Sequence, residues 1–314
     1  MSEQERQHIF IVNPVSGKED AGRSMVPLIE KAAADCGIKP LFEMTKAPQH
    51  ATELAEKHAA EGRPVRLYAV GGDGTLNEVF KGAYPFANAE VASVPCGSGN
   101  DFVRSFGVPE DFLDLPSLLR GEAIRIDLMR VDEGICAAIT STGLDAEVAY
   151  NIPKYRRIPL LGGTMAYNIS IVERLLHRMG KLLRVEIDGK VFEGEFLIAT
   201  VCNGQTYGGG YRAAPMASLE DGILEVILVE RTGRLRIAQI IGKYKRGEHY
   251  AQGQIVPEMQ DVMQYHRAKE VTILPLGPEP FILNVDGECG PAPRLYAKAM
   301  PLAAQFVLPL SLRG

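Results

Sequence analysis

The segment Val70–Val79 reads VGGDGTLNEV and joins an apolar, strand-like run at 65–70 to a helix-like run at 76–82. This order predicts a strand, a glycine loop and a helix. Three glycines around one carboxylate, Asp73, let the backbone turn tightly and approach a ligand without a Cβ in the way. The first free N–H groups of the helix point at the same spot, so the segment predicts a seat for a phosphate group.

Asp73 separates two interpretations of this loop. A carboxylate would repel a bare phosphate, so its presence indicates a divalent cation between the carboxylate and the phosphate oxygens, and therefore a magnesium nucleotide. The structural alternative is a tight turn in which Asp73 only caps the helix through Thr75 or Leu76. A single glycine loop does not decide between them.

A second glycine loop follows the next apolar run, at 91–95. It reads Cys96-Gly97-Ser98-Gly99-Asn100-Asp101, again ends in an acid and again opens a helix. Two such loops on neighbouring strands would form one crevice at the carboxyl edge of a sheet, where open α/β folds bind ligands. The second loop therefore favours the nucleotide interpretation.

Composition limits the class of protein. The 314 residues suit about two domains, and 46% hydrophobic with 23% charged residues is ordinary for a soluble globular chain. A formal charge of -5 gives no general attraction for nucleic acid. The five cysteines are widely spaced without CxxC pairs, which argues against a disulfide framework or a zinc site and indicates a reducing cytosol. We expect neither a simple signal peptide nor a membrane-spanning segment.

The first 125 residues alternate strand-like and helix-like runs. Besides the two strands already named, strands are expected at 8–12 and 40–45, and helices at 25–36 and 48–58, with Pro27 tolerable only in a first turn. The turn at 13–18, NPVSGK, lacks the spacing of a Walker loop and on its own is a structural turn. The alternation predicts a parallel sheet covered on both faces.

From residue 124 onward, strand-like runs follow one another and predict an antiparallel β domain. These runs lie at 124–131, 135–140, 182–187, 192–203, 222–229, 270–274 and 280–285. Two helices are expected among them, at 164–179 and 232–244, and their apolar stripes are interpreted as core. The boundary near 127–131 is expected to be a short hinge.

Two acidic segments of this second half have more than one interpretation. Asp221-Gly222 is either an ordinary β-turn or part of a loop whose carbonyls and carboxylate hold a hard cation. Asp286 and Glu288, two carboxylates around a glycine, are either a solvated hairpin turn or include a catalytic base that faces the crevice.

Together these segments resemble the diacylglycerol kinase catalytic-domain family, the bacterial soluble lipid kinases related to sphingosine kinases and more distantly to NAD kinases. The resemblance spans nearly the whole chain and rests on NPVSG at 13–17, GGDGTLNE at 71–78, GSGNDF at 97–102, YGGG at 207–210, LEDGIL at 219–224 and VDGE at 285–288. The six motifs in this order are much more specific than any one alone. Among the departures, Ser98 stands where the family usually has threonine, and it keeps the hydroxyl.

The resemblance implies an α/β plus β-rich fold. It consists of an NAD-kinase-like nucleotide-binding α/β domain at 1–129, a second antiparallel β-sandwich-like domain at 130–299, and a C-terminal return to the first domain at 300–314. ATP would lie in the cleft and contact Asn13, Pro14, Val15, Ser16, Gly17, Thr45, Gly71, Gly72, Asp73, Gly74, Thr75, Leu76, Asn77, Gly97, Ser98, Gly99, Asn100 and Asp101.

The resemblance also implies two places for magnesium. Asp73 and Asp101 would belong to the network of magnesium and phosphate. Asp221, with the carbonyls of Ser218 and Ile223, would hold a structural magnesium.

The implied catalytic residues are Asp286, as the base, and Glu288, as its assistant. Phosphoryl transfer asks the protein to hold the γ-phosphate, neutralise its oxygens and orient a hydroxyl in line. Asp286 would accept the hydroxyl proton.

The implied function is an ATP-dependent lipid kinase, with diacylglycerol converted to phosphatidic acid as the first expectation. Phosphatidylglycerol, a sphingoid base and NAD stay open as other hydroxyl acceptors. The non-enzymatic alternative is a nucleotide-binding regulator without the chemistry, against which Asp73 and Asp286 count. ATP and Mg²⁺ are the expected co-substrate and metal, nucleic acid is not an expected partner, and the choice between monomer and homodimer stays open.

A lipid acceptor requires a surface that touches a bilayer. The stretch Ile152–Leu161, IPKYRRIPLL, mixes cations, an aromatic residue and aliphatic residues, which suits an interfacial contact. The alternative is a structural loop, because scattered apolar residues need no special explanation. We therefore expect a cytoplasmic protein that is peripheral at the inner membrane surface.

Overall fold

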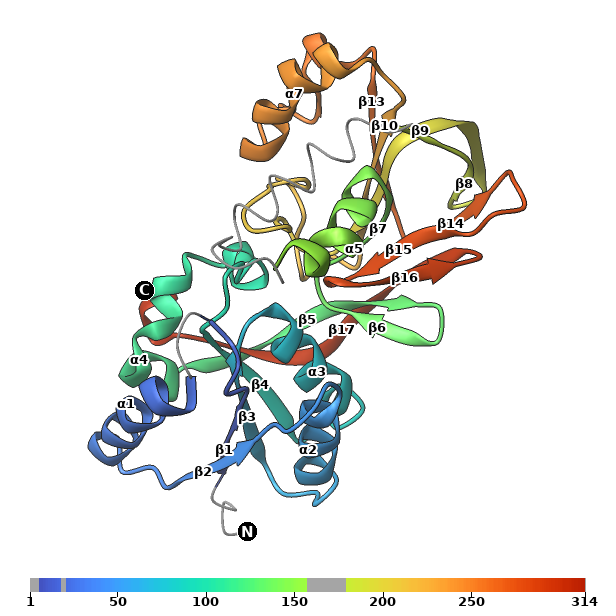
Figure 1. The fold of residues 1–314 in the computed structure, drawn as a ribbon. Helices are drawn as coiled ribbons and strands as arrows, with labels where there is room; N and C mark the ends of the chain where they lie inside the picture. The colour runs from blue at the N-terminus through green and yellow to red at the C-terminus, as the bar shows by residue number, and fades with distance from the viewer. Residues whose placement is uncertain (1–5, 18–20, 157–178, 314) are drawn as a thin grey trace. The chain divides into compact units, whose positions relative to one another are not determined.

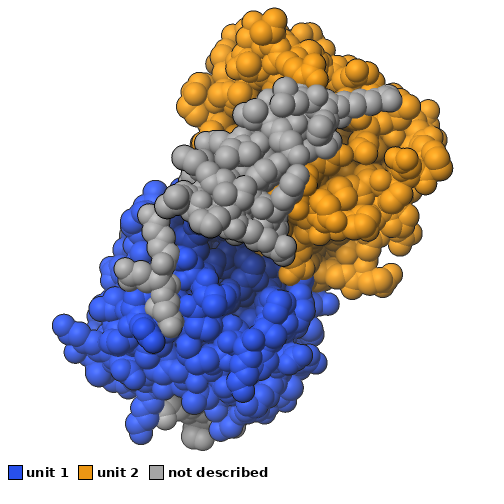
Figure 2. All heavy atoms as spheres, viewed as in Figure 1, with its two compact units in different colours: residues 1–128, 301–314 blue, residues 129–300 orange. Residues whose placement is uncertain are grey.

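The computed structural model describes residues 6–17, 21–156 and 179–313, with only the backbone given at 152–156. The chain forms two compact units (Figures 1 and 2). Unit 1 contains residues 1–128 and 301–314, and unit 2 contains residues 129–300. The chain passes between the units within two strands, β5 (Glu122–Val131) and β17 (Leu295–Leu308).

Unit 1 contains a parallel sheet whose neighbouring strands run in the order β2, β1, β3, β4. The bounds are β1 (Gln7–Val12), β2 (Pro40–Met44), β3 (Val65–Gly71) and β4 (Ala89–Pro95). Every residue of β3 is buried. That pattern is typical of a central parallel strand covered on both faces, because helices cross over between parallel strands.

Three helices of unit 1 connect these strands in turn, and a fourth follows β4. They are α1 (Ala21–Asp35), α2 (His50–Ala59), α3 (Asp73–Ala83) and α4 (Leu115–Leu119), with short 3₁₀ turns at Phe102–Ser105, Pro109–Leu113 and Leu310–Leu312. α3 begins at Asp73 and not at residue 76, because extended Gly72 is its N-cap and a polar first turn suits a helix N-terminus. The expectation for Pro27 was wrong, since it lies inside α1 beyond the first turn.

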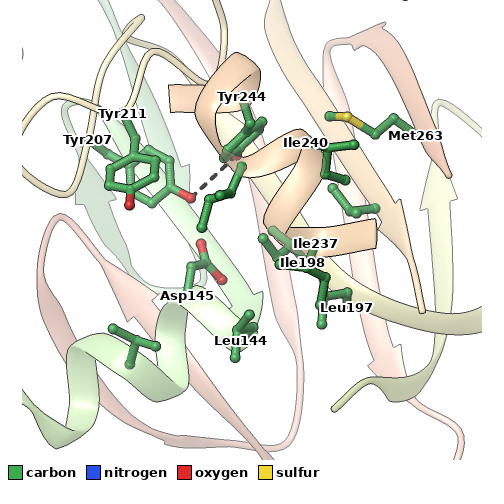
Figure 3. A pocket seen from close by; sticks show the side chains of 13 residues that line it. Leu144, Asp145, Leu197, Ile198, Tyr207, Tyr211, Ile237, Ile240, Tyr244 and Met263 are labelled. Carbon is green, nitrogen blue, oxygen red and sulfur yellow. Dashed lines mark hydrogen bonds between the residues drawn. The ribbon is translucent and has the colours of Figure 1, made fainter. Parts of the chain in front are cut away.

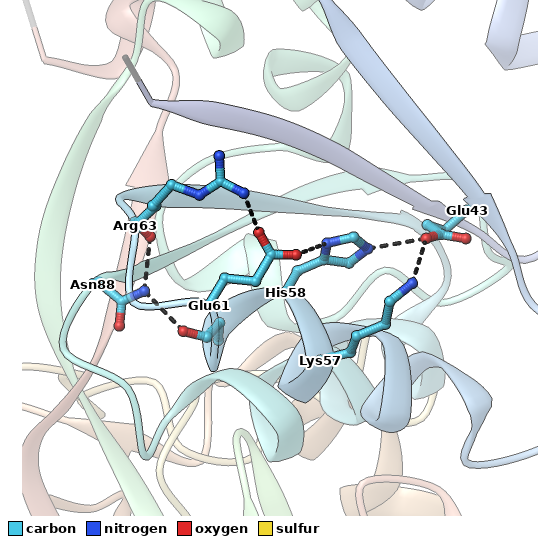
Figure 4. Close-up of polar contacts among 7 residues, drawn as sticks. Glu43, Lys57, His58, Glu61, Arg63 and Asn88 are labelled. Carbon is cyan, nitrogen blue, oxygen red and sulfur yellow. Dashed lines mark hydrogen bonds and ion pairs between the residues drawn. The ribbon is translucent and has the colours of Figure 1, made fainter. Parts of the chain in front are cut away.

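Polar contacts attach α2 to the edge strand β2 (Figure 4). The ring of buried His58 lies between two carboxylates, with Nε2 at 3.0 Å from Glu43 Oε1 and Nδ1 at 3.5 Å from Glu61 Oε1. The Asn88 amide donates to the carbonyls of Ala59 and Arg63 at 2.9 and 2.8 Å and so satisfies the carboxyl end of the helix. These contacts fix the strand that leads to Thr45.

Unit 2 is mostly antiparallel. Its strands are β6 (Gly134–Cys136), β7 (Ile139–Gly143), β8 (Lys181–Ile187), β9 (Lys190–Cys202), β10 (Leu224–Glu230), β11 (Tyr250–Ala251), β12 (Gln254–Ile255), β13 (Met263–Ala268), β14 (Glu270–Pro275), β15 (Phe281–Val285) and β16 (Glu288–Ala292). Strand β9 is central, because it pairs with β7, β8 and β10.

Two helices of unit 2 lie within the described residues, α5 (Leu144–Arg156) and α7 (Arg234–Arg246), with a 3₁₀ turn at Pro257–Met259. The helix expected at 232–244 corresponds to α7. The expected helix at 164–179 lies almost entirely outside the described residues, and α5 was not expected. Residues alternate between the two faces of β10: Leu224, Val226 and Leu228 join one apolar cluster, whereas Ile227 and Val229 join the cluster that contains α7.

Candidate functional site

Four parallel strands of unit 1 end together, and the predicted nucleotide segments follow them. The register pairs Val12 with both Met44 and Val70, and Gly71 with Pro95. Thr45 N donates to Val12 O at 2.9 Å, and the backbone N–H of Cys96 donates to Gly71 O at 2.7 Å. The segments 13–17, 45, 71–77 and 96–101 therefore gather at the carboxyl edge of the sheet, where open α/β folds bind ligands.

The two glycine loops approach each other more closely than side chains would allow. A Cβ on Gly97 would lie 2.5 Å from Gly72 Cα, and a Cβ on Gly72 would lie 3.1 Å from Gly97 Cα. A side chain at 97 would force the backbones apart, and one at 72 would be tight, which explains the glycine in both loops. The result is a narrow backbone cradle at the start of α3, a suitable seat for phosphate.

Asp73 and Asp101 converge within this cradle. Asp73 Oδ1 accepts a hydrogen bond from Phe102 N at 3.1 Å, so this carboxylate ties the first loop to the second. Asp73 Oδ2 and Asp101 Oδ2 lie 3.0 and 3.1 Å from the position that a Cβ on Gly99 would take. Two carboxylates facing one small gap are suitable oxygen ligands for Mg²⁺, which takes one or two carboxylates together with phosphate and water.

Two asparagines predicted to contact ATP shape the loops. Asn100 has a positive φ of 52°, and its amide accepts from Gly97 N and donates to Gly97 O, both at 2.9 Å. Asn13 Nδ2 donates to Thr75 Oγ1 at 3.1 Å, while its Oδ1 accepts from Val15 N at 3.2 Å. Asn100 thus holds its own turn closed, whereas Asn13 also joins its turn to the first turn of α3.

Asn77 is different, because its side chain has no hydrogen-bond partner among the described residues. It is 1% exposed, and neither its Oδ1 nor its Nδ2 is satisfied. Leaving such a group without a partner costs about 1–3 kcal/mol, so a polar ligand atom is a natural partner here. Leu76, by contrast, packs its side chain into the core.

The remaining predicted contacts differ in exposure. Four of them are exposed: Val15, Gly17, Gly74 and Ser98. Four others are buried or partly buried: Pro14, Ser16, Gly71 and Thr75. Exposed Val15 has no core to pack into, and Ser16 Oγ lies 3.8 Å from where a Cβ on Gly72 would be. Ser16 therefore borders the cradle. Whether each residue touches a nucleotide stays a prediction.

In unit 2, Asp286 forms a two-residue hairpin turn with Gly287. Strands β15 and β16 flank this turn, and φ is positive at both residues, 47° and 91°. Positive φ at both central positions is the requirement of a type I′ turn, for which Asp-Gly is a preferred sequence. The hairpin interpretation thus holds for the backbone, while Glu288 is exposed at the start of β16.

The Asp286 carboxylate is held by three backbone donors. Its Oδ2 accepts from Ala137 N at 2.6 Å, and its Oδ1 accepts from Ala138 N at 3.0 Å and from Ile139 N at 2.9 Å. The strand expected at 135–140 is divided into β6 and β7 at this point, because these N–H groups donate to Asp286 and not to a neighbouring strand. Burial raises the pKa of Asp286 above its ordinary value, and the backbone donors oppose the rise.

The sequence interpretation did not identify Asp145, which lies in the first turn of α5. Its Oδ1 is buried without a hydrogen-bond partner among the described residues, and its Oδ2 is 3.5 Å from Thr200 Oγ1. Burial raises the pKa of Asp145 to about 6, which the hydroxyl groups of Ser141 and Tyr207 partly oppose. The one signal in the sequence that could have identified Asp145 is an acidic residue shortly after the small, polar residues that end a strand.

Asp145 borders an apolar pocket in unit 2 (Figure 3). The pocket comprises about 610 Å³, part of it open to solvent. It is lined by Leu144, Asp145, Val148, Leu197, Ile198, Tyr207, Tyr211, Val229, Ile237, Ile240, Ile241, Tyr244 and Met263. The Tyr207 and Tyr244 hydroxyls are 3.3 Å apart. An apolar space with a few polar groups is the usual form of a small-molecule site.

The loop expected to hold structural magnesium has other partners in the structure. Asp221 Oδ1 accepts from Ile223 N at 3.1 Å, and Asp221 Oδ2 pairs with the Arg267 guanidinium. Ser218 Oγ accepts from Glu220 N at 3.3 Å. In the part of the chain that the structure describes, no three His, Cys, Asp or Glu side chains gather in a way that could hold a metal ion.

The proposed membrane stretch Ile152–Leu161 lies outside the residues whose side chains the structure describes. Its backbone is described only as far as Arg156, the end of α5. Across residues 6–17, 21–156 and 179–313, no helix is both long and apolar enough to cross a bilayer.

Comparison with known families agrees with this architecture. Residues 7–131 match the diacylglycerol kinase catalytic domain, and residues 138–308 match the YegS C-terminal NAD kinase beta sandwich-like domain. The predicted fold class, an NAD-kinase-like α/β domain followed by an antiparallel β-sandwich-like domain, is confirmed.

Several relatives share most of the chain. A diacylglycerol kinase of Staphylococcus aureus (strain bovine RF122 / ET3-1) is 31% identical, with 90% of this chain and 85% of the relative covered. A diacylglycerol kinase of Bacillus subtilis (strain 168) is 30% identical, with 90% and 89% covered. Among solved structures, one from Bacillus anthracis str. Sterne covers 98% of both chains at 22% identity, with a TM-score of 0.73, which shows the shared fold.

Proposed function

Because the chain belongs to the diacylglycerol kinase catalytic-domain family and is thus a phosphotransferase of the kinase class, we propose that it transfers the γ-phosphoryl group of ATP to a lipid hydroxyl. Diacylglycerol, converted to phosphatidic acid, is the first acceptor that this proposal names. The apolar pocket beside Asp145 is the observation that supports a lipid acceptor most directly.

Unit 1 is proposed to hold ATP. The backbone cradle at Gly72 and Gly97 would receive phosphate oxygens, and the unsatisfied amide of Asn77 would meet a polar atom of the nucleotide. Magnesium bound between Asp73 and Asp101 would neutralise phosphate charge. The Asp73 contact with Phe102 N keeps the two loops in register for this task.

Unit 2 is proposed to hold the acceptor. The apolar lining of the pocket would take hydrocarbon, and its burial is favourable at about 25 cal/mol per Å². Asp145, with an unsatisfied oxygen in an otherwise apolar lining, would accept a hydrogen bond from the polar end of the lipid. A soluble acceptor such as NAD would gain little from such a lining.

Asp286 is the proposed proton acceptor, with Glu288 as its assistant. Three backbone donors fix the Asp286 carboxylate in one orientation, and Oδ2, which has one N–H donor, keeps a lone pair for the acceptor hydroxyl. A raised pKa suits a base, because proton transfer is most efficient when the catalytic pKa approaches the working pH.

A sphingoid base is a second candidate acceptor, and Asp145 favours it. A carboxylate buried among tyrosine and isoleucine side chains gains from a nearby ammonium group, which diacylglycerol lacks. Replacing Asp145 with leucine separates the two lipids. Loss of activity on a sphingoid base with activity on diacylglycerol retained would indicate an amine-bearing acceptor.

The test of the lipid site is to fill the pocket. Ile241→Trp adds bulk at the lining, whereas Ala238→Trp adds the same side chain at an exposed position of α7 that does not line the pocket. We expect Ile241→Trp to lower phosphorylation of vesicle-borne lipid by about tenfold or more, with ATP affinity unchanged. Equal lipid activity in both variants would contradict this pocket as the acceptor site.

A further inference from the structure

A cation of the chain itself pairs with Asp221, the carboxylate to which the family resemblance assigns structural magnesium. The Arg267 guanidinium on β13 pairs with Asp221 Oδ2, and Arg267 Nε donates to Glu225 Oε1 at 3.2 Å. Asp221 Oδ1 accepts from Ile223 N at 3.1 Å. Both oxygens of the carboxylate that would bind the metal therefore already have a donor.

The position of Arg267 follows from the sheet and not from the loop. Arg267 and Glu225 are directly opposite each other in the antiparallel register of β10 and β13. The Glu225 side chain is 1% exposed, so its charge needs a partner within the fold. Burial raises the pKa of Glu225, and the charge of Arg267 opposes that rise. Cross-strand pairing thus keeps the guanidinium beside Asp221.

The donor set at Asp221 suits a guanidinium better than Mg²⁺. Mg²⁺ at Asp221 would take this carboxylate, the carbonyls of Ser218 and Ile223 and several water molecules, a set that offers the ion only one negative charge. A divalent ion at Asp221 would also be repelled by the charge of Arg267. A guanidinium is planar, always charged and has five donors, so it can bind two carboxylates at once. The residues present do not fit a structural magnesium.

We propose that Arg267 takes the place of a structural metal ion in unit 2. Its guanidinium bridges Asp221 and Glu225 and so fixes the loop 218–223 to the start of β10 without a divalent cation. Any dependence of the reaction on magnesium then belongs to the nucleotide in unit 1. This inference concerns stability and does not rest on the proposed kinase activity.

The test compares melting temperatures of the full chain in excess EDTA and across a magnesium titration. For each protein, the change in melting temperature on adding magnesium is measured, and the same change is measured for its Asp221→Asn counterpart. The difference between the two changes is the Asp221-dependent shift. We expect no such shift in the wild type, because Arg267 already neutralises the carboxylate. Arg267→Gln should melt about 2–6 °C lower than the wild type. It should also acquire an Asp221-dependent shift, because the Asp221 carboxylate no longer pairs with a guanidinium and can bind magnesium.

Arg184→Gln is the matched control. Arg184 pairs with Glu193 directly across β8 and β9, and both side chains are exposed, whereas the partner of exposed Arg267, Glu225, is buried. Loss of Arg184 should therefore hardly change the melting temperature. An Asp221-dependent magnesium shift in the wild type would overturn the proposal. So would an Arg267→Gln protein that melts like the wild type. Equal magnesium-induced shifts in Arg267→Gln and in the Arg267→Gln/Asp221→Asn double variant would also contradict it, because no magnesium site would then have formed at Asp221.

Discussion

Gly72 and Gly97 come from different loops, yet a Cβ on Gly97 would lie only 2.5 Å from Gly72 Cα. This contact holds the loops that follow β3 and β4 close together beside Asp73 and Asp101. A nucleotide site in unit 1 depends on this contact, because a wider separation of the loops would remove the backbone cradle.

Gly97→Ala should therefore separate the two loops. We expect ATP affinity to fall by about tenfold or more while the protein remains folded, because the added methyl group meets the Gly72 backbone as well as Asn100 Oδ1, at 2.9 Å. Gly277→Ala is the control, since a Cβ there meets nothing within 4 Å. Isothermal titration with magnesium and ATP measures both variants. An unchanged affinity for Gly97→Ala would show that the nucleotide does not use this cradle.

Asp73 has two separable roles, as a tether and as a metal ligand. Asp73→Asn can keep an oxygen for Phe102 N but loses the charge, whereas Asp73→Ala loses both. We expect both variants to bind magnesium and ATP weakly, and only Asp73→Ala to lose about 1 kcal/mol of stability as well. Titration and chemical unfolding measure the two effects. If Asp73→Asn binds ATP with normal magnesium dependence, Asp73 is not a metal ligand and serves only to hold the two loops together.

Asp286→Asn should lower turnover by about two to four decades, with ATP affinity nearly unchanged, because the proton acceptor is lost. The structure adds a second effect. An amide NH₂ would face one of the backbone donors at 137–139, so stability should fall by about 1–3 kcal/mol. Steady-state kinase assays measure the turnover, and urea unfolding measures the stability. Full turnover in a correctly folded variant would place the base elsewhere.

The pH dependence of stability should identify Asp145. Its pKa in the folded protein, about 6, lies above the model-compound value of 3.8, so the folded state binds more protons between about pH 4 and 6. The contribution of Asp145 therefore lowers stability as pH rises through that window. Asp145→Asn should remove this contribution and be more stable than the wild type at pH 7, by about 1–3 kcal/mol.

Urea unfolding at several pH values measures this difference, and Glu133→Gln, at an exposed acid, is the control. Other titrating groups are common to all three proteins and cancel in the comparison. Parallel stability curves for the wild type and Asp145→Asn would contradict a buried carboxyl with a raised pKa at this position.

The sequence predicts unit 1 well because its signals are local. The glycines around Asp73 and around Asn100 are close in sequence to the strands that position them, and parallel strands place their carboxyl ends at one edge. The start of α3 was three residues off, because a glycine N-cap gives no side-chain signal for the beginning of a helix.

The site in unit 2 was harder to predict because its contacts join distant segments. The donors to Asp286 come from residues 137–139, about 150 positions earlier. The lining of the Asp145 pocket comes from six separate segments, and Asp221 meets Arg267 only through the register of β10 and β13. No local pattern encodes which residue of one strand lies opposite which residue of another.

The most direct test of the proposed lipid kinase activity is to identify the molecule that receives the γ-phosphoryl group. Purified protein is incubated with magnesium, ATP labelled on its γ-phosphate, and vesicles that contain diacylglycerol, phosphatidylglycerol or a sphingoid base, with NAD in a parallel reaction. The account predicts that label enters a lipid, with phosphatidic acid from diacylglycerol as the first expectation, and that Asp286→Asn abolishes this label. Label in NAD with none in any lipid would contradict the account.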